Sequence, residues 1–536
     1  MAKYVFISGG VCSSLGKGVA ASSLANLLEG HGYNISLVKI DPYLNVDAGT
    51  MNPYQHGEVY VTDDGAETDL DLGNYARFTN SLLTRDNSIT TGQIYQEVVR
   101  KEREGKYLGQ TVQVIPHITD EIKQRICRVA EKNNVDIVIV EIGGTVGDIE
   151  SVPFIEAARQ FLHDFGKENV LYIHLTLVPA VSGGELKTKP TQHSVKELLE
   201  LGIQPDILLC RCEQILDQKL KQKIALFTNV APEAVISAYN VKTSIYEIPI
   251  IFAKQNLDLI VLAKLGLKPS THNKRIKLWE KMITSYCSAQ KSVRIGIVGK
   301  YLDLHDSYKS IFEALVHGGI AHGINVKIVK IDSQLVDAVD DNSWLKTIDG
   351  ILIPGGFGVR GTSGMIIAAR LAREQGIPYF GICLGMQIMV IEFARHVLGL
   401  KDANSTEFNP QCKDPVISLL EEQENISMLG GTMRLGASKT KLKENSLIRK
   451  IYGSEIIEER HRHRYEVTSR YCEVLERNGL IITGTTLDGK LVETVEWLDH
   501  PFGIGVQFHP EYKSKPELPH PLFKSFVGEC IKYARL

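Results

Sequence analysis

The chain has no apolar run close to the roughly 20 residues that a membrane-spanning helix needs. Residues 4–8 predict a β-strand of a folded domain, not the apolar stretch of a secretion signal. The chain has 60 lysines and arginines and 63 aspartates and glutamates, which leaves a net charge of −3. This balance excludes a general attraction to nucleic acids or anionic membranes, so anionic ligands have to be bound locally. We expect a cytoplasmic protein that binds neither nucleic acid nor membrane.

Cysteine is also scarce, with 9 in 536 residues and no CxxC pair. An odd number without paired spacing argues against a disulfide framework and against a zinc site. Cys210 and Cys212 fall on one face of a strand-like segment, DILLCRC, so we interpret them as packing residues. The alternation from His461 to Arg464 is a poor site for a divalent metal, because neighbouring guanidinium charges repel the cation.

Internal repeats and low-complexity tracts are absent, and the chain instead alternates apolar runs with helical segments. Residues 1–266 show this pattern, which is typical of a parallel sheet flanked by helices. Residues 267–291 contain a Pro-Ser-Thr breaker, a basic amphipathic helix and no strand, so they predict an interdomain linker. The alternation restarts at Val293. We therefore expect an α/β protein with two domains, each a mostly parallel sheet flanked by helices.

The segment GICLGMQ places Cys383 between a short apolar strand and a helix. At such a turn the thiol is exposed, and the helix N-terminus favours its thiolate. In the later segment QFHPE, His509 can serve as the base and Glu511 can orient it. A cysteine after an apolar strand is often only a core residue. An upstream PGGFG loop favours catalysis, because the amide of Gly356 can join that of Leu384 in binding an oxyanion. The sequence thus predicts a Cys-His-Glu hydrolytic site.

The first strand runs directly into a glycine-rich loop, GGVCSSLGKG, which a helix follows. Such a loop presents backbone N–H groups and a positive helix end to phosphate, and Lys17 can reach the β and γ oxygens. The loop departs from the strict P-loop pattern in two ways. Its spacing from Gly10 to Gly16 is one residue longer, and Gly18 replaces the Ser or Thr that normally touches magnesium. The metal must then be held elsewhere.

Two acidic residues are candidates for that role. Glu141 lies at the carboxyl end of the strand-like VDIVIVE, where ligands bind in such sheets. Asp71, in ETDLD, taken alone also fits a surface or capping acid. With the phosphate loop in the same domain, the two carboxylates favour a magnesium site.

A third polar cluster, ELKTKPTQHS, precedes a helix that begins near Val195. Lysines at a helix entrance are often only solvated. Here two lysines, several hydroxyls and an amide converge ahead of a helix N-terminus, which suits a second triphosphate and a polar base edge. Lys223, on another predicted helix, is uninformative alone.

Several long motifs carry a resemblance to known families. Residues 292–536 resemble a class I glutamine amidotransferase domain. The strings SSLGKG, KIDPYLN, DGAETDLDLG, VEIGGTVGDIES, KTKPTQHSVKELL, GICLGMQ, RHRYEV and QFHPE together resemble the CTP synthase family over essentially the whole chain. The resemblance implies that ATP phosphorylates O4 of UTP, that ammonia attacks C4 and that phosphate leaves to give CTP. It also implies that the cysteine opens the glutamine amide through a glutamyl thioester.

Carried over position by position, the resemblance implies a set of ligand contacts. The residues for ATP are Ser14, Leu15, Gly16, Lys17, Gly18, Val19 and Asp71, and those for magnesium are Asp71 and Glu141. The residues for UTP are Ser13, Lys187, Thr188, Lys189, Pro190, Thr191, Gln192 and Lys223. The residues for inhibitory CTP are Ser13, Asp148, Ile149, Glu150, Lys187, Gln192 and Lys223. The residues for glutamine are Gly356, Leu384, Gly385, Met386, Gln387, Glu407 and Arg464, with Arg464 on the α-carboxylate and Glu407 on the ammonium group.

The resemblance also implies a division of labour and a set of partners. Residues 1–266 would be the amidoligase domain, 267–291 the linker and 292–536 the glutaminase domain. The implied cofactor is Mg²⁺ with ATP, without an organic prosthetic group. GTP is the implied activator, CTP the feedback inhibitor and a homotetramer the implied assembly.

Two other functions remain open from the residues. One is a different P-loop amidotransferase, for example one that amidates a carboxylate of a corrin precursor; the KTKPTQ cluster favours a second nucleotide instead. The other is a nucleotide-switched structural or regulatory ATPase with a degenerate C-terminal half. The presence of Cys383, His509 and Glu511 argues against degeneracy.

Overall fold

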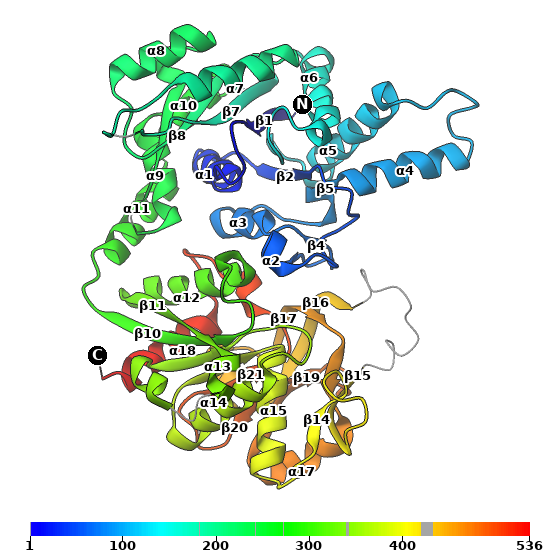
Figure 1. Ribbon diagram of the computed structural model, residues 1–536, viewed down its shortest axis with the longest axis vertical. Coiled ribbons are helices and arrows are strands. Elements are labelled where there is room, and N and C mark those ends of the chain that lie inside the picture. Colours follow the sequence, from blue (N-terminus) through cyan, green and yellow to red (C-terminus); the bar gives the residue numbers. More distant parts are fainter. Residues whose placement is uncertain are drawn as a thin grey trace. The chain divides into compact units, whose positions relative to one another are not determined.

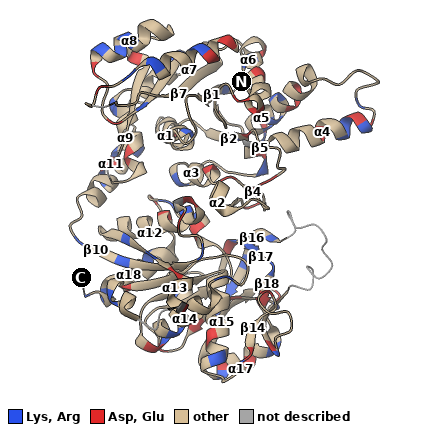
Figure 2. Cartoon of the chain, viewed as in Figure 1, with Lys and Arg blue, Asp and Glu red and all other residues tan. Residues whose placement is uncertain are grey.

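The computed structural model describes residues 2–181, 183–241, 243–271, 273–338, 342–419 and 433–535 (Figure 1). The chain separates into two compact units. The first comprises Met1–Ala48 and Asp71–Ile283, and the second comprises Gly49–Leu70 and Thr284–Leu536. Figure 2 shows lysines and arginines interspersed with aspartates and glutamates along both units, in agreement with the near-zero net charge. Among the described residues, none of the helices has both the length and the apolar character needed to cross a bilayer.

The first unit is built on a parallel sheet. Within the described residues it has seven strands, in the order β5 (Ser88–Thr90), β2 (Ile35–Asp41), β6 (Ile137–Ile142), β1 (Lys3–Gly9), β7 (Val170–Leu177), β8 (Ile207–Cys212) and β9 (Val235–Tyr239). All their pairings are parallel. Because helices cover both faces, the central strands are buried throughout, and this explains why their sequences are continuous apolar runs.

Helices pack on each face of this sheet. On one face, α4 (Thr91–Arg103), α5 (Thr119–Asn133) and α6 (Val152–Phe165) form a core with Tyr4 and Phe6 of β1. On the other face α1 (Lys17–Gly30) packs against α3 (Asp71–Phe78) and α9 (Ile248–Lys254). The remaining helices are α7 (Lys189–Glu200), α8 (Gln218–Thr228), α10 (Leu257–Lys264) and α11 (Lys274–Cys287), with short helices η1 (Arg85–Asn87), η2 (Val114–Ile118), η3 (Ile149–Ser151), η4 (Pro232–Ala234) and η5 (Ile245–Glu247).

The second unit is built on a mixed sheet. Within the described residues it has nine strands, in the order β11 (Asn325–Asp332), β10 (Ser292–Gly299), β12 (Gly350–Ile353), β13 (Tyr379–Ile382), β21 (Gly503–Val506), β20 (Val492–Trp497), β19 (Leu480–Thr486), β16 (Arg434–Leu442) and β17 (Ile456–His463). The pairings are parallel from β11 to β21 and antiparallel from β21 to β17. The expected parallel sheet is therefore present but extended by antiparallel strands. Smaller sheets join β14 (Ala403–Ser405), β15 (Asp414–Leu419) and β18 (Tyr465–Val467), and β3 (Tyr60–Val61) with β4 (Glu67–Thr68).

Two helical layers enclose the parallel part of this second sheet. On one face, α12 (Lys309–His322) and α18 (Pro521–Tyr533) pack through aromatic residues such as Phe312, Phe523 and Phe526. On the other face lie α14 (Thr362–Gln375) and α15 (Leu384–His396). The remaining helices are α2 (Pro53–His56), α13 (Ser333–Ala338), α16 (Leu447–Tyr452) and α17 (Cys472–Arg477), with η6 (His305–Tyr308), η7 (Asn342–Thr347), η9 (Ser469–Tyr471) and η10 (Pro510–Lys513).

The compact units differ from the predicted 1–266 and 292–536 boundaries in one segment, residues 49–70. In the sequence this segment lies between two stretches of the first unit, yet its contacts group it with the second unit. Charge pairs contribute to this grouping. Arg462 Nε donates to Glu67 Oε1 at 2.9 Å, and Arg460 Nε donates to Asp63 Oδ1 at 2.6 Å. The paired residues lie far apart in the sequence, so their positions along the chain do not predict these pairs.

The predicted linker, 267–291, also differs from expectation. Most of it forms α11, and the first unit includes the chain up to Ile283. Trp279 anchors the helix, because its side chain is fully buried, contacts Phe78 and Tyr246, and donates from Nε1 to the Tyr246 carbonyl at 2.6 Å. The amphipathic helix therefore packs on the first unit through Trp279, and the first unit includes it as far as Ile283.

Candidate functional site

Cys383 lies at a sharp turn between β13 and α15, where its φ of 52° is unusual for a residue with a side chain. Neighbouring backbone leaves room only for glycine on either side of it. A Cβ on Gly381 would lie 2.6 Å from the carbonyl carbon of Gly385, and one on Gly385 would lie 2.1 Å from the carbonyl oxygen of Ile353. The glycines of GICLGMQ thus permit the close backbone packing that holds the thiol at the head of the helix.

His509 and Glu511 form a buried pair in the same unit. His509 Nδ1 lies 2.7 Å from Glu511 Oε1, and both side chains are buried. Burial alone would lower the pKa of His509, but the Glu511 carboxylate and Cys383 raise it to about 10. Gln507 Nε2 donates to Cys383 Sγ at 3.7 Å. The structure therefore brings together the three residues that the sequence predicts as nucleophile, base and orienting carboxylate.

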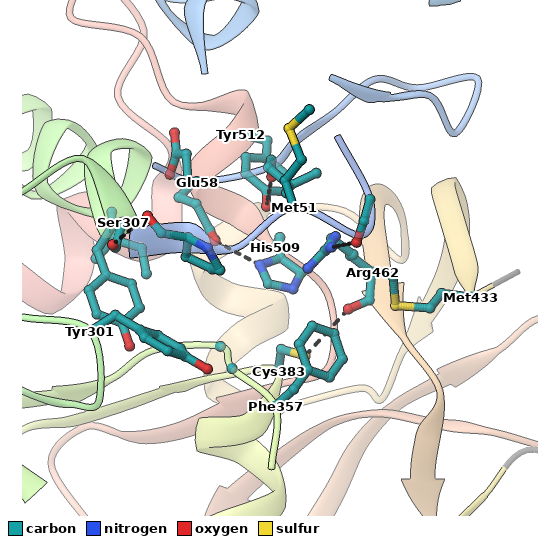
Figure 3. Close-up of a pocket in the computed structure, with 18 of the residues that line it drawn as sticks. Met51, Glu58, Tyr301, Ser307, Phe357, Cys383, Met433, Arg462, His509 and Tyr512 are labelled. Carbon is teal, nitrogen blue, oxygen red and sulfur yellow. Dashed lines mark hydrogen bonds and ion pairs between the residues drawn. The ribbon is translucent and has the colours of Figure 1, made fainter. Parts of the chain in front are cut away.

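These residues open onto one cavity of about 360 Å³ (Figure 3). Of the sequence-predicted residues, it is lined by Gly356, Cys383, Arg464, His509 and Glu511. Gly355 and Phe357, from the predicted PGGFG loop, also line it. The lining residues without a sequence prediction for this site are Gly49, Thr50, Met51, Pro53, Glu58, Val59, Tyr301, Ser307, Tyr308, Ile311, Met433, Arg462 and Tyr512. Figure 3 shows Cys383 and His509 pointing to this space, with Met51, Phe357 and Arg462 around them.

Segment 49–70 supplies one wall of this cavity. Tyr512, next to the His509–Glu511 pair, donates from its hydroxyl to the Val59 carbonyl at 2.9 Å, and the Tyr60 hydroxyl donates to the Tyr512 carbonyl at 3.0 Å. Ser310 N donates to Glu58 Oε2 at 2.8 Å. The segment is thus tied to the elements that carry the pocket.

Strand β17 explains the alternation of histidine and arginine. Arg460 and Arg462 pair with segment 49–70, whereas the histidines between and after them are fully buried. His461 Nδ1 and His463 Nε2 lie 3.0 Å apart. Side chains alternate between the two faces of a strand, so the arginines lie on one face of β17 and the histidines lie on the other. No cluster of three or more potential metal ligands occurs among the residues that the structure describes.

The other predicted glutamine residues surround the cavity without lining it. Leu384, Gly385, Met386 and Gln387 form the buried first turn of α15. Gln387 Nε2 donates to the Tyr465 carbonyl at 3.1 Å. Glu407 Oε1 accepts from the amide of Gly358 at 2.6 Å, and burial raises the pKa of its carboxyl.

The glycine-rich loop of the first unit lies between β1 and α1. Gly16 has a φ of 92° and precedes Lys17, the first residue of the helix. Lys17 Nζ donates to the carbonyl of Gly144, and burial lowers its pKa. The amide of Val146 donates to the Gly9 carbonyl at 2.8 Å. The loop therefore meets the segment that follows β6, at the carboxyl edge of the sheet.

Asp71 and Glu141 converge on one lysine. Lys39 Nζ, from β2, contacts Asp71 Oδ2 and lies 3.3 Å from Glu141 Oε1. Burial raises the pKa of Asp71, but Lys39 outweighs it and holds that pKa below its ordinary value. Burial, and after it the charge of Asp71, raises the pKa of Glu141. Lys17 adds a second positive charge that acts on both carboxylates. The two carboxylates are therefore held close together among basic groups, where their oxygens can also serve a divalent cation.

Gly18 explains the departure from the P-loop pattern. A Cβ at this position would lie 2.1 Å from Asp71 Oδ1, so the space of the usual Ser or Thr is taken by a carboxylate. Two carboxylates are a small ligand set, and Mg²⁺ commonly completes such a set with water and substrate phosphate oxygens. The residues present therefore fit a magnesium ion bound together with a phosphate ligand.

A second cavity, of about 130 Å³, adjoins the loop. It is lined by Ser14, Leu15, Gly16, Val19, Ala20, Leu175, Arg211, Ala238, Tyr239, Val241, Ile245, Ile248, Ile251 and Phe252. The sequence analysis missed its residues beyond Val19, because they come from distant elements, mainly β8, β9 and α9. Its apolar walls and single arginine suit a flat aromatic ligand with polar edges.

The KTKPTQ cluster forms the entrance of α7. Thr188 precedes the first residue, Lys189, and Pro190 occupies the first turn, where its missing N–H costs nothing. Gln192 Nε2 donates to Thr188 Oγ1 at 3.1 Å, and Thr191 Oγ1 donates to the Leu177 carbonyl at 3.0 Å. The polar side chains are therefore fixed at the head of the helix.

Lys223, on α8, joins this cluster. Its helix, α8, packs against α7. Lys187 Nζ pairs with Glu185 Oε2 at 2.6 Å, and this hydrogen bond and the charge of Lys187 lower the pKa of Glu185, with a smaller contribution from the charge of Lys223. The tertiary structure thus brings the helix of Lys223 next to the KTKPTQ helix, which its position in the sequence does not show.

Of the predicted CTP residues, Asp148, Ile149 and Glu150 lie just after the loop that meets Lys17. Thr145 N donates to Asp148 Oδ2 at 2.7 Å, while Ile149 and Glu150 are exposed in η3. Ser13 is exposed at the glycine-rich loop. A Cβ on Gly147 would lie 3.5 Å from Glu197 of α7, so this loop also approaches the KTKPTQ helix.

Comparisons with known proteins decide the family. A profile of "CTP synthase N-terminus" matches residues 3–267, and one of "Glutamine amidotransferase class-I" matches residues 303–528. A CTP synthase of Aquifex aeolicus is 56% identical over 536 residues, which is 100% of this chain and 99% of that protein. One of Carboxydothermus hydrogenoformans is 55% identical over 537 residues and 100% of both chains. The chain belongs to the CTP synthase family.

As a member of the CTP synthase family, the chain is an enzyme, a ligase that carries a glutamine amidotransferase domain. Among solved structures, the glutaminase domain of Trypanosoma brucei CTPS with bound acivicin is 40% identical and covers 45% of this chain and 94% of that chain, with a TM-score of 0.42. The N-terminal CTP synthase match includes residues 49–70. Sequence from the synthetase half of the family thus lines the cavity that holds Cys383.

Proposed function

We propose that the chain makes CTP by joining two reactions, one in each compact unit. The overall reaction is the glutamine-dependent conversion of UTP to CTP in pyrimidine biosynthesis, and it depends on ATP. In the first unit the γ-phosphoryl group of ATP passes to O4 of UTP. In the second unit glutamine releases ammonia, which attacks C4 and displaces phosphate. Phosphorylation is needed because an amide-like oxygen is a poor leaving group.

The glutaminase reaction is assigned to Cys383. Its thiol passes a proton to His509, and Sγ attacks the side-chain amide carbon of glutamine. Glu511 accepts from His509 Nδ1, which leaves Nε2 to exchange protons with the thiol and the departing ammonia. The amides of Gly356 and Leu384 bind the oxyanion. Water then cleaves the thioester and releases glutamate.

Glutamine binding is assigned to charged groups at two sides of the cavity. Arg464 pairs with the α-carboxylate of glutamine, and Glu407 pairs with its ammonium group. The buried first turn of α15, Leu384 to Gln387, supports these contacts from behind. The pocket lining supports the Arg464 assignment more directly than the Glu407 assignment, because only Arg464 lines the cavity.

ATP binding is assigned to the glycine-rich loop and the cavity beside it. The phosphates lie against residues 14–19, with Lys17 on the transferred group, since its charge and position suit a γ-phosphate. The apolar cavity takes the adenine ring. Asp71 and Glu141 are assigned to hold magnesium, whose charge would neutralise the phosphate oxygens when it is bound.

UTP is assigned to the head of α7, and CTP to an overlapping site. Residues 187–192, Lys223 and Ser13 contact UTP. Asp148, Ile149 and Glu150 contact the part of CTP that differs from UTP. The support is that the loop after β6, the phosphate loop and α7 approach one another in the first unit.

Regulation and assembly follow the family pattern in this proposal. GTP activates the glutaminase, CTP inhibits by feedback, and the chain forms a homotetramer in the cytoplasm. We assign the synthetase role to residues 1–266 and the glutaminase role to 292–536, with segment 49–70 shared between them.

The observation that carries the proposal is the buried His509–Glu511 pair in the cavity of Cys383, in a chain that also has a glycine-rich phosphate loop with Lys17 at the head of its helix. The test is absorbance-detected conversion of UTP to CTP with ATP, magnesium and glutamine, leaving out one component at a time. We expect each omission to stop the reaction and ammonium to replace glutamine. ATP hydrolysis that does not respond to UTP would point to another acceptor, such as a carboxylate.

A further inference from the structure

A buried imidazole in the first unit has no part in the assignments above. Ser8 on β1 and His174 on β7 are direct neighbours in the parallel register, so their side chains share one face of the sheet. Ser8 Oγ lies 2.9 Å from His174 Nδ1, and Ser194 Oγ, on α7, lies 2.7 Å from His174 Nε2. His174 is fully buried, and the two serines are nearly so. The three side chains form a continuous hydrogen-bonded link, here called the Ser-His-Ser link.

The link joins the two segments that are assigned to the two nucleotides. β1 continues from Ser8 into the phosphate loop, where a Cβ on Gly10 would lie 1.8 Å from Ser194 Oγ. The amide of Gly10 also donates to the Leu175 carbonyl of β7 at 3.0 Å. On the other side, Ser194 belongs to the helix whose head carries residues 187–192. The loop and the helix therefore meet at His174.

The chemistry of His174 lets it bridge both hydroxyl groups of the link. Burial, and after it the charge of Lys17, lowers the pKa of His174 to about 3, so the ring is neutral at working pH. A neutral imidazole has one N–H and one lone pair, so it donates to one serine and accepts from the other. An apolar ring of the same size would leave both hydroxyl groups without this partner.

We propose that His174 is a positioning residue for phosphoryl transfer. Through Ser8 and Ser194 it sets the separation of the phosphate loop and α7, and thereby of the γ-phosphate of ATP and O4 of UTP. The inference rests on the proposed function, because it takes the loop as the ATP site and the head of α7 as the UTP site. In-line transfer depends on this separation more steeply than the binding of either nucleotide, since a shift of about 1 Å can cost about 100-fold in rate.

The test uses the full chain with ammonium as nitrogen donor, so that the glutaminase step is bypassed. We expect Ser194→Ala to lower kcat about tenfold and His174→Phe about thirtyfold, because each leaves transfer misaligned. The Kd values of ATP and UTP, measured separately by equilibrium binding, change less than about threefold. The double variant falls no further than His174→Phe, because both changes break the same link. Glutamine hydrolysis by the second unit is unchanged.

Ser36→Ala is the matched control. Ser36 is a buried serine of β2 that accepts from Asn87 Nδ2 at 3.0 Å, but it lies at the opposite end of its strand from the ligand-binding edge. The Ser36→Ala variant loses a hydrogen bond similar to the one that Ser194→Ala loses. We therefore expect its thermal unfolding midpoint to fall by a comparable amount, while its kcat stays within about twofold of wild type.

Three results would overturn the inference. They are wild-type kcat in folded Ser194→Ala and His174→Phe, a rise in Kd with unchanged kcat, and an equal loss of kcat in Ser36→Ala. A wild-type chain that binds both nucleotides but makes no CTP would refute the proposed function as well, and so separates the two failures.

Discussion

Replacing Glu511 by Gln tests the electrostatic design of the glutaminase site. The amide keeps the size of the side chain and an acceptor for His509 Nδ1, which lies 2.7 Å from Glu511 Oε1, but removes the negative charge. In the wild type this carboxylate is the largest contribution that raises the pKa of His509, against the opposing effect of burial. Without it, burial dominates and the pKa falls.

The magnitude follows from the size of that shift. The net rise in the pKa of His509 from 6.5 to about 10 corresponds to about 5 kcal/mol at about 1.4 kcal/mol per pH unit, and it remains after burial has opposed the contributions of Glu511 and Cys383. If Glu511 supplies about half, its loss disfavours the thiolate–imidazolium pair by about 2–3 kcal/mol. We expect the glutaminase rate of Glu511→Gln to fall about 30- to 150-fold at neutral pH.

The pH dependence has a definite sign. The pKa of His509 is raised in the folded state, so the charged imidazole stabilises the folded site. This stabilisation is fully present below pH 6.5 and is lost as the pH rises through about 10. We expect the wild-type glutaminase rate to hold through neutral pH and fall toward pH 10. In Glu511→Gln the fall begins near or below neutrality.

The assay is glutamate formation between pH 5 and pH 10, with CTP formation from ammonium as the measure of an intact first unit. Glu459→Gln is the control, because Glu459 pairs with His520 at 2.9 Å in an equally buried setting away from the thiol. It should lower the unfolding midpoint and leave the glutaminase pH profile alone. A wild-type rate and profile in folded Glu511→Gln would refute the reasoning.

The remaining predictions separate the sites. Lys17→Ala should abolish CTP formation from both glutamine and ammonium, because both routes need phosphoryl transfer and lose its charge clamp; near-normal synthesis from ammonium would contradict this. Cys383→Ala should stop glutamine-dependent synthesis but leave ammonium-dependent synthesis, assayed at mildly alkaline pH, within a few-fold of wild type; loss of both in a folded variant would refute separate sites. Glu150→Ala should raise the CTP concentration for half-inhibition about 5- to 150-fold, the loss of one polar contact; unchanged inhibition with normal UTP saturation would place CTP elsewhere.

Local sequence patterns were sufficient for the parallel strands of both units, but not for the antiparallel strands that extend the second sheet. Continuous apolar runs predict parallel strands buried on both faces, and these strands form the first sheet. The glycines around Cys383 predict a tight turn, and the structure gives their reason in close backbone contacts. These features are readable because each depends on neighbours within a few residues along the chain.

The cavity around Cys383 could not be predicted in full from local sequence patterns. Its wall from residues 49–70 depends on Arg460 and Arg462, which lie far along the chain and pair with acidic side chains of that segment. The sequence shows the arginines only as part of an alternation with histidine. Ion pairs between residues so far apart in sequence leave no recognisable pattern in residue spacing. Only the tertiary structure shows which charged residues pair.

The phosphate site divides in the same way. The sequence by itself determined the glycine-rich loop, its lysine and the absence of the usual hydroxyl at Gly18. The tertiary structure decided that Asp71 fills that space, that Lys39 lies between Asp71 and Glu141, and that His174 joins the loop to α7. A loop conformation is set by adjacent backbone, whereas the groups that converge on it come from separate strands whose register exists only in the folded sheet.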